Sequence, residues 1–292
     1  MDSPVSATAQ VDSAGSAFAR ELKAALATGR IELPSFPDVA LRVQQVLADD
    51  AVSTEMVVRI VGAEPMLAAR VVSLANSAAM NPSSHQVTDL RTAVSRMGFD
   101  SLRAAAVSFA MAQLSSRADY ANIAEPLAAN WRDSVSFAST ASVVARRSQR
   151  MSPDTALFAG LVAGVGKVYL LTRASRHPKL LADTGAYQAI VREWHINIAH
   201  SLLASWHVAE DVIEAVEAYE RRNDEMRPGP PLADVLACAA LINRFHDAPA
   251  HLAESLPNSR AAQRLGLAKA APDAIMADAA SELSKLNAAL GR

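Results

Sequence analysis

Apolar residues recur along the chain at intervals of three and four positions, which is the period of one face of an α-helix. The first clear stripe is Phe18, Leu22 and Leu26, and we find no convincing strand pattern. We therefore expect an all-α fold. The spacing predicts further helices within residues 39–47, 56–61, 67–75, 90–97, 102–110, 127–150, 155–163, 178–192, 197–206, 209–222 and 232–246, followed by two amphipathic stretches.

Capping and turn residues mark where these helices begin and end. Gly98 is expected to end a helix that Thr88 or Asp89 caps, and Asp100 is expected to cap the next one. Ser53 is a further expected N-cap. The order of these signals predicts short helices joined by tight connections.

The segment Leu33–Pro37 cannot lie inside a helix. Pro34 and Pro37 each lack a backbone donor and each restricts the residue before it. We expect the segment to pack along the bundle as a rigid, extended strap, with Leu33 and Phe36 sealing apolar surface between helices.

Asn76 lies between a predicted helix and a turn-rich loop that Ser77 opens. An asparagine side chain can hydrogen-bond backbone groups in irregular segments, where the end of a helix leaves carbonyls without partners. We expect Asn76 to fix the loop 77–86 through side-chain-to-backbone hydrogen bonds.

The chain divides into three parts by these signals. Residues 1–14 are small and polar and predict a disordered tail. Residues 15–125 predict an N-terminal helical bundle, and Pro126 opens a second helical bundle over 126–292. The expected architecture is two packed helical subdomains.

Composition excludes several classes of protein. Hydrophobic residues make up 51% and charged residues 20% of the chain, so it is not disordered. The 28 Lys and Arg against 30 Asp and Glu give a net charge of −2, which argues against a nucleic-acid partner held by a basic surface. Aromatic residues are only 5%, which favours helices over strands.

No signal for export or membrane insertion stands out. The N-terminus carries Asp2 and Asp12 and no basic region of the kind that precedes a secretory signal. The uncharged and largely apolar stretch 104–116 is shorter than the ~18 apolar residues needed to span a bilayer. We expect a cytoplasmic protein with no membrane partner.

Two kinds of candidate chemistry favour a structural interpretation. Cys238, the one cysteine, has apolar neighbours and is expected to be a buried core residue. His195, His200 and His207 are five and seven residues apart, whereas metal ligands on one helix want a spacing of three or four. We interpret His200 as a hydrogen-bonded packing residue, with a ligand or partner contact as the alternative.

Lys167 ends the segment GLVAGVGK, which superficially suggests a phosphate-binding loop. Such a loop needs four residues between its first glycine and Gly-Lys, then Ser or Thr. Here five residues intervene and Val168 follows, so the glycines are interpreted as helix-packing positions. Lys167 remains a candidate contact for an anionic ligand.

Six segments together resemble the HDOD family (HD-related output domain) of bacterial signalling proteins. Among them, the segment at 200–206 brings His200 and Trp206 into the resemblance. The resemblance runs from about residue 20 to the end of the chain. The segments are LPSFP (33–37), AEPMLAARVVSLANSA (63–78), VTDLRTAVSRMGFDSLR (87–103), NWRDSV (130–135), ALFAGLVAGVGKVYLL (156–171) and HSLLASW (200–206).

The C-terminal half is similar to the HD phosphohydrolases, all-helical enzymes that hold divalent metal with a His, an adjacent His-Asp pair and a distal Asp. The resemblance puts the pair on Ala163 and Gly164 and the upstream His on Asp133. The distal Asp falls on Ala240 or, with a slip of six residues, on Asp234. An adjacent His pair found in some active relatives would fall on Tyr219 and Glu220.

These departures decide the expected chemistry. Ala163 and Gly164 have no side-chain lone pair, so they cannot hold a metal ion. Metal-assisted hydrolysis depends on an ion that lowers the pKa of its bound water from 15.7 to about 7. We expect no metal, no cofactor and no enzymatic activity.

The sequence therefore predicts a non-catalytic signal-transduction output or scaffold module that binds a regulatory protein partner. One alternative is a metal-dependent phosphohydrolase of a nucleotide or cyclic dinucleotide that uses ligands not recognised here. Another is a small-molecule sensor that uses the former active-site cavity to bind a ligand such as a nucleotide.

Overall fold

Helices make up the regular structure of the chain. The computed structural model describes residues 4–28, 31, 33, 37–49, 51–76, 86–221 and 230–289, of which 4–14, 115 and 288–289 are described by backbone alone. No strand occurs in these ranges, so the all-α prediction is confirmed. The helices are α1 (Pro4–Ala27), α2 (Asp38–Leu47), α3 (Thr54–Gly62), α4 (Pro65–Ala75), α5 (Leu90–Ser115), the 3₁₀ helix η1 (Ala118–Ile123), α6 (Ala124–Ser148), α7 (Pro153–Ala163), α8 (Val165–Ala174), α9 (Pro178–Ala182), α10 (Thr184–Ser205), α11 (Glu210–Glu220), α12 (Pro231–Arg244), α13 (Pro249–Ser255), α14 (Arg260–Arg264) and α15 (Pro272–Ala289).

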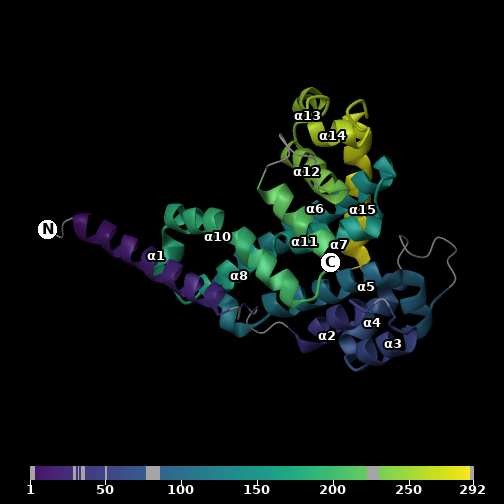
Figure 1. The fold of residues 1–292 in the computed structure, drawn as a ribbon, viewed down its shortest axis with the longest axis horizontal. Coiled ribbons are helices and arrows are strands. Elements are labelled where there is room, and N and C mark those ends of the chain that lie inside the picture. Colours follow the sequence, from purple (N-terminus) through teal and green to yellow (C-terminus); the bar gives the residue numbers. More distant parts are fainter. Residues whose placement is uncertain are drawn as a thin grey trace.

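The helices α2 to α5 form an N-terminal bundle in which α5 packs against the other three. Figure 1 shows this bundle on one side of the molecule and α12–α14 at the opposite end. Ser53 caps α3 by accepting a hydrogen bond from the Met56 N–H, and Asp89 caps α5 by accepting from the Thr92 N–H. Both caps are residues that the sequence identifies.

Gly98 divides α5 into two helical parts. Its φ of 73° lies in the left-handed region that glycine adopts without strain. The helix thus breaks where the sequence predicts it to end, but Asp100 does not cap the second part. Its carboxylate instead accepts hydrogen bonds from Arg103 Nη1 at 3.1 Å and from Thr155 Oγ1 at 2.8 Å. The capping prediction for Asp100 is wrong, since the carboxylate bonds the side chains of Arg103 and Thr155 instead.

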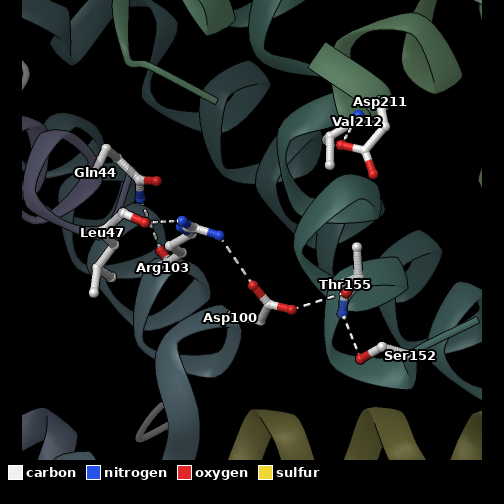
Figure 2. A network of polar contacts seen from close by, with 8 residues as sticks. All are labelled: Gln44, Leu47, Asp100, Arg103, Ser152, Thr155, Asp211 and Val212. Carbon is white, nitrogen blue, oxygen red and sulfur yellow. Dashed lines mark hydrogen bonds and ion pairs between the residues drawn. The ribbon is translucent and has the colours of Figure 1, made fainter. Parts of the chain in front are cut away.

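These bonds of Asp100 belong to a polar network that joins the two halves of the molecule (Figure 2). Arg103 also donates to the Leu47 carbonyl at the end of α2, while Gln44 Nε2 donates to the Arg103 carbonyl at 3.2 Å. Thr155 lies in the first turn of α7, where its N–H donates to the Ser152 cap. The network therefore ties α2, α5 and α7 together at the junction between the bundles.

Helix α1 departs from the expected domain division. It packs mainly against α10 and α9 of the C-terminal half and extends outward from the body of the molecule (Figure 1). The stripe predicted from the sequence is correct, since Phe18 and Leu22 are buried. The rings of Phe18 and His177 pack at a steep angle with their centroids 5.0 Å apart, and Glu21 Oε2 lies 3.3 Å from His177 Nε2.

The N-terminal tail is also corrected. Helix α1 begins at Pro4, so residues 4–14 are helical where the sequence predicts disorder. Proline is well suited to the first turn of a helix, and this stretch contains little that interrupts one. The predicted strap lies only partly within the described residues: Leu33 is buried and Pro37 is extended before α2, whereas Pro34 and Phe36 fall outside them, as does Ser77.

In the C-terminal half, α6 packs against α7, α12 and α15. A Cβ atom on Gly160 of α7 would lie 2.6 Å from the Ala138 Cα, so only glycine permits this approach to α6. Ion pairs hold α15 on the other side of α6, from Arg147 to Asp278 at 2.7 Å and from Arg146 to Glu282 at 3.2 Å.

The stretch Pro153–Ala174, which contains α7 and α8, is long and apolar enough to cross a membrane by length and composition. However, 83% of its apolar window is buried inside the molecule. Its composition is therefore explained by packing in the core, and the turn at Gly164 divides it into two helices.

The Asn76 side chain connects the end of α4 to Val87, which precedes α5. Its Nδ2 donates to the Val72 carbonyl at 3.1 Å and to the Val87 carbonyl at 2.7 Å. Its Oδ1 accepts from the Val87 N–H at 2.7 Å. The two bonds to Val87 connect positions eleven residues apart, so this one side chain joins the end of α4 to the approach to α5.

Replacing Asn76 should therefore destabilise the protein. We expect Asn76→Ala to lower the free energy of unfolding by about 1–3 kcal/mol, because part-buried backbone groups of Val72 and Val87 lose their partner. Asn76→Asp should also be harmful, since it exchanges two donors for a charge. Urea denaturation measures both changes.

The matched control is Asn258→Ala, which removes an exposed side chain bonded only to the Glu254 carbonyl at 2.9 Å. This variant should change stability by less than about 0.5 kcal/mol. An unchanged denaturation midpoint for Asn76→Ala would contradict the structural role of Asn76.

Candidate functional site

A cleft of about 1570 Å³ opens in the C-terminal half. One wall consists of residues from α6, the α7–α8 turn and the end of α11, and the other of residues from α12 to α15 and their connections. The cleft is therefore built from segments that lie more than a hundred residues apart in the sequence.

The positions that the sequence resemblance assigns to the metal ligands of the HD phosphohydrolases all line this cleft. We call them the vestigial centre. Each of these positions lines the cleft, and Lys167 lines it beside them. Positions assigned from separate segments of sequence are thus brought together in space. The vestigial centre consists of Asp133, Ala163, Gly164, Tyr219, Glu220 and Ala240.

Asp234, the alternative to Ala240, has a different role. Its carboxylate pairs with Arg264, with Arg264 Nε at 2.7 Å and Nη2 at 2.5 Å from its two oxygens. Asp234 is 6% exposed and does not line the cleft. The geometry therefore favours Ala240 as the counterpart of the distal ligand, and Asp234 joins α12 to α14.

Three residues of the site form a chain of polar contacts beside the vestigial centre. Lys167 Nζ lies 2.9 Å from Glu220 Oε1, and His195 Nε2 lies 3.1 Å from Glu220 Oε2. His195 Nδ1 lies 2.6 Å from the Val191 carbonyl, to which it donates. These contacts join α8, α10 and α11 through one carboxylate.

The surroundings of Glu220 act on its pKa in opposite directions. Burial raises the pKa, but the hydrogen bond from His195 and the charge and hydrogen bond of Lys167 lower it by more. The net result is a pKa below the ordinary value of 4.5. Glu220 is thus held as a carboxylate at the edge of the cleft.

Sequence reasoning missed the contact between His195 and Glu220. Histidine spacing along one helix does not reveal this contact, because Glu220 lies 25 residues away from His195 on a different helix. His200 makes a similar contact with Glu217 Oε1 at 2.7 Å, but its side chain is 46% exposed and it does not line the cleft. Trp206 is buried at the end of α10.

Aromatic and polar side chains continue the cleft beyond the vestigial centre. The rings of Phe137 and Tyr219 stack with their centroids 5.2 Å apart. Thr140 Oγ1 donates to Asn243 Oδ1 at 2.6 Å, which ties α6 to α12. The lining thus offers both an aromatic surface and amide and hydroxyl groups.

The donor set does not fit the divalent metal that HD-type centres hold. Ala163, Gly164 and Ala240 carry no ligating atom. Within the described parts of the chain, no group of three or more His, Cys, Asp or Glu side chains is arranged to hold a metal ion. Lys167 also places its positive charge against the Glu220 carboxylate, with Nζ 2.9 Å from Oε1. Cys238 is buried, and burial raises the pKa of its thiol to about 12, which leaves it unsuited to ligation or nucleophilic attack.

Comparison with known proteins agrees with this architecture. The family model of the HDOD domain matches residues 33–221. The chain belongs to the HDOD domain family. The match ends at the last described residue after α11, so the helices α12–α15 that form the second wall of the cleft lie beyond it.

Solved structures share the fold of this HDOD protein over almost its whole length. A protein from Shewanella amazonensis, provisionally named a metal-dependent phosphohydrolase, is 25% identical, with a TM-score of 0.65 over 91% of this chain and 99% of that chain. An HDOD domain protein of unknown function from Geobacter sulfurreducens is 22% identical, with a TM-score of 0.63 over 92% and 96%.

A third structure, from Marinobacter aquaeolei and provisionally named a signal transduction protein, is 21% identical, with a TM-score of 0.56. The match covers 92% of this HDOD chain and 66% of the Marinobacter chain. No curated protein gives a significant match.

The lowered pKa of Glu220 gives a pH-dependent contribution to stability. Because the folded-state pKa lies below the ordinary value of 4.5, this contribution is present above about pH 4.5 and is lost as the pH falls through the folded-state pKa. Glu220→Gln should lower the free energy of unfolding at pH 7 by about 1–3 kcal/mol. The difference between the two proteins should shrink when urea denaturation is repeated below pH 4.5.

The control for this series is Glu254→Gln, an exposed carboxylate elsewhere on the cleft. At pH 7 it should change stability by less than about 0.5 kcal/mol. A Glu220→Gln deficit that stays constant as the pH is lowered would show that the charge of Glu220 is not what stabilises the fold.

Proposed function

We propose that this HDOD protein is a non-catalytic signal-transduction output module that binds a regulatory protein partner in the cleft. The observation that carries the proposal is the contrast between shape and chemistry in the vestigial centre. A cleft of about 1570 Å³ is present, whereas Ala163, Gly164 and Ala240 lack the atoms with which a hydrolase would hold its metal.

The chemistry of the cleft supports binding over hydrolysis. A water molecule at neutral pH becomes a strong nucleophile when a metal ion lowers its pKa, and the donors for such an ion are missing here. Glu220 is engaged by Lys167 and His195, so its carboxylate is not free to act as a base.

Family membership supports a signalling role. The chain belongs to the HDOD family, and a protein of the same fold from Marinobacter aquaeolei carries the name of a signal transduction protein. The phosphohydrolase name of the Shewanella amazonensis relative favours the opposite interpretation. The vestigial centre argues against transferring that activity to this chain.

A small-molecule sensor is the second candidate, and the size and lining of the cleft favour it. The cleft, at about 1570 Å³, has room for a ligand, since ligand pockets commonly have ~300–1,000 Å³. The stacked pair Phe137 and Tyr219 offers a flat apolar surface, with Asn130 and Lys167 lining the same cleft. A nucleotide matches these groups. A shift in melting temperature with nucleotides, without capture of a protein, would favour the sensor.

The proposal predicts that the protein partner depends on an open cleft. Ala240→Arg places a long side chain at a cleft-lining position, and Ala189→Arg places the same side chain on the exposed face of α10. In pull-downs from the native cell extract, Ala240→Arg should lose the partner at least about tenfold, whereas Ala189→Arg should retain it.

Asp133→Lys is a second variant of the cleft. It should disturb the fold less than Ala240→Arg, because Asp133 is an exposed residue of the cleft lining. Circular dichroism checks that each variant folds. Recovery of the same partner at the same level by Ala240→Arg, Asp133→Lys and the unaltered protein would reject the cleft as the binding site.

The proposal also predicts that the purified protein contains no stoichiometric transition metal and does not hydrolyse phosphodiesters. Elemental analysis and a phosphodiesterase assay measure the two properties. About one or two equivalents of Mn, Fe or Zn per chain, together with turnover that a chelator abolishes, would contradict it.

A further inference from the structure

The α12 helix turns one side toward the cleft. Four of its residues line the cleft at the spacing i, i+3, i+4 and i+7, which places them on one face of the helix. They are Ala237, Ala240, Leu241 and Arg244. The three apolar residues among them are only partly buried, so the described chain leaves this face partly uncovered.

The α15 helix turns a similar face toward the same cleft. Its cleft-lining residues have the same spacing, and all of them are apolar. They are Met276, Ala279, Ala280 and Leu283. None of the four is fully buried, and Ala280 is exposed. Two apolar helix faces therefore border the cleft and remain open to it.

Helix α6 lies beneath both faces. The helices α12 and α15 each pack extensively against α6, whereas they hardly touch each other. Phe137 and Thr140 of α6 line the cleft, and Thr140 bonds Asn243 of α12. Helix α13 contacts both α12 and α15 and so bridges the two sides. We call the result the three-helix groove: α6 is its floor, and α12 and α15 are its sides.

The shape of the three-helix groove suits a fourth helix. Helix axes pack about 8–10 Å apart, and the alanines on both sides of the groove allow a close approach. An amphipathic helix laid in the groove would cover the open faces of α12 and α15, as in a four-helix bundle. The stripe on each side extends over about 10 Å, so the groove matches roughly two turns of a docked helix.

Positive charge gathers along one side of the groove. Arg244 ends α12 and Arg260 begins α14, and both are exposed residues of the cleft lining. Neither guanidinium group pairs with another residue that the structure describes. Glu254 lines the cleft on this side and offsets one of the two charges, whereas the exposed carboxylate Asp133 lies on α6. The side formed by α12 to α14 thus favours an acidic partner.

We propose that the three-helix groove binds an amphipathic helix of the protein partner, with acidic side chains on the flank that faces Arg244 and Arg260. The apolar stripe of that helix covers the open faces of α12 and α15. Its carboxylates pair with the two guanidinium groups, whose planar donors match carboxylate oxygens. The inference rests on the proposed function and adds the chemistry of the segment that the partner presents.

The first test selects peptides from a display library of helix-forming sequences of about 14 residues, roughly four turns. The purified protein is the bait, so the natural partner is not needed. Peptides retained by the unaltered protein and lost by Ala240→Arg should carry apolar residues at i, i+3, i+4 and i+7, with Asp or Glu along one edge of that stripe. A proline placed mid-peptide should abolish binding, because it interrupts a helix.

Charge reversal tests the acidic flank. Fluorescence anisotropy measures how a labelled selected peptide binds. Arg244→Glu combined with Arg260→Glu should weaken binding at least about fivefold, and a peptide whose acidic residues are changed to Lys should regain affinity for this variant. The matched control is Arg176→Glu with Arg192→Glu, which reverses two exposed arginines outside the cleft lining and should leave binding unchanged. Circular dichroism checks that each variant folds.

Four results would overturn the proposal: no peptide that Ala240→Arg loses, selected peptides without a helical period, full binding of the proline peptide, or charge reversal without effect. A dimer that Ala240→Arg dissolves would assign the groove to a second copy of the chain and would also overturn it. The pull-down from cell extract reports on the proposed function separately. A natural partner lost by Ala240→Arg, with no acidic helical peptide selected, would uphold the proposed function and reject this inference.

Discussion

The cleft depends on the close packing of α7 and α8 against their neighbours. At Gly160 the approach to α6, and at Gly166 the approach to α10, leave no space for a Cβ atom. A larger residue at either position would push one wall of the cleft outward. Because interiors are packed to the density of crystals, such a shift would be transmitted through the core. Two glycines thus set the shape of the site, although neither carries chemistry.

The same scaffold explains how the cleft keeps its form although Ala163, Gly164 and Ala240 carry no ligating atom. Helix packing positions Asp133, Gly164 and Ala240 on one cleft regardless of the atoms they carry. The charge that would otherwise be left on Glu220 is met from within the chain by Lys167 and His195. The HDOD fold therefore provides a cavity whose stability does not require the chemistry of the hydrolases that it resembles. Such a cavity is suited to binding.

Local signals made much of this structure predictable from the sequence. Ser53 and Asp89 cap helices, and Gly98 breaks one, because capping and positive φ depend on a few neighbouring residues. The positions of the vestigial centre followed from the resemblance of short motifs. Contacts between distant helices were not predictable: α1 docks on α9 and α10, Asp100 bonds Thr155, and His195 meets Glu220. Each of these depends on how helices are arranged in space, which spacing along one helix does not contain.

The central claim is that the cleft binds a protein partner and does not catalyse hydrolysis. Hydrogen–deuterium exchange of the intact protein, with and without its captured partner, tests it most directly. The account predicts new protection in the cleft walls, at the end of α11 and in α12 and α15, with little change in α2–α4 of the N-terminal bundle. Protection confined to α2–α4, with the cleft walls exchanging as in the free protein, would contradict it.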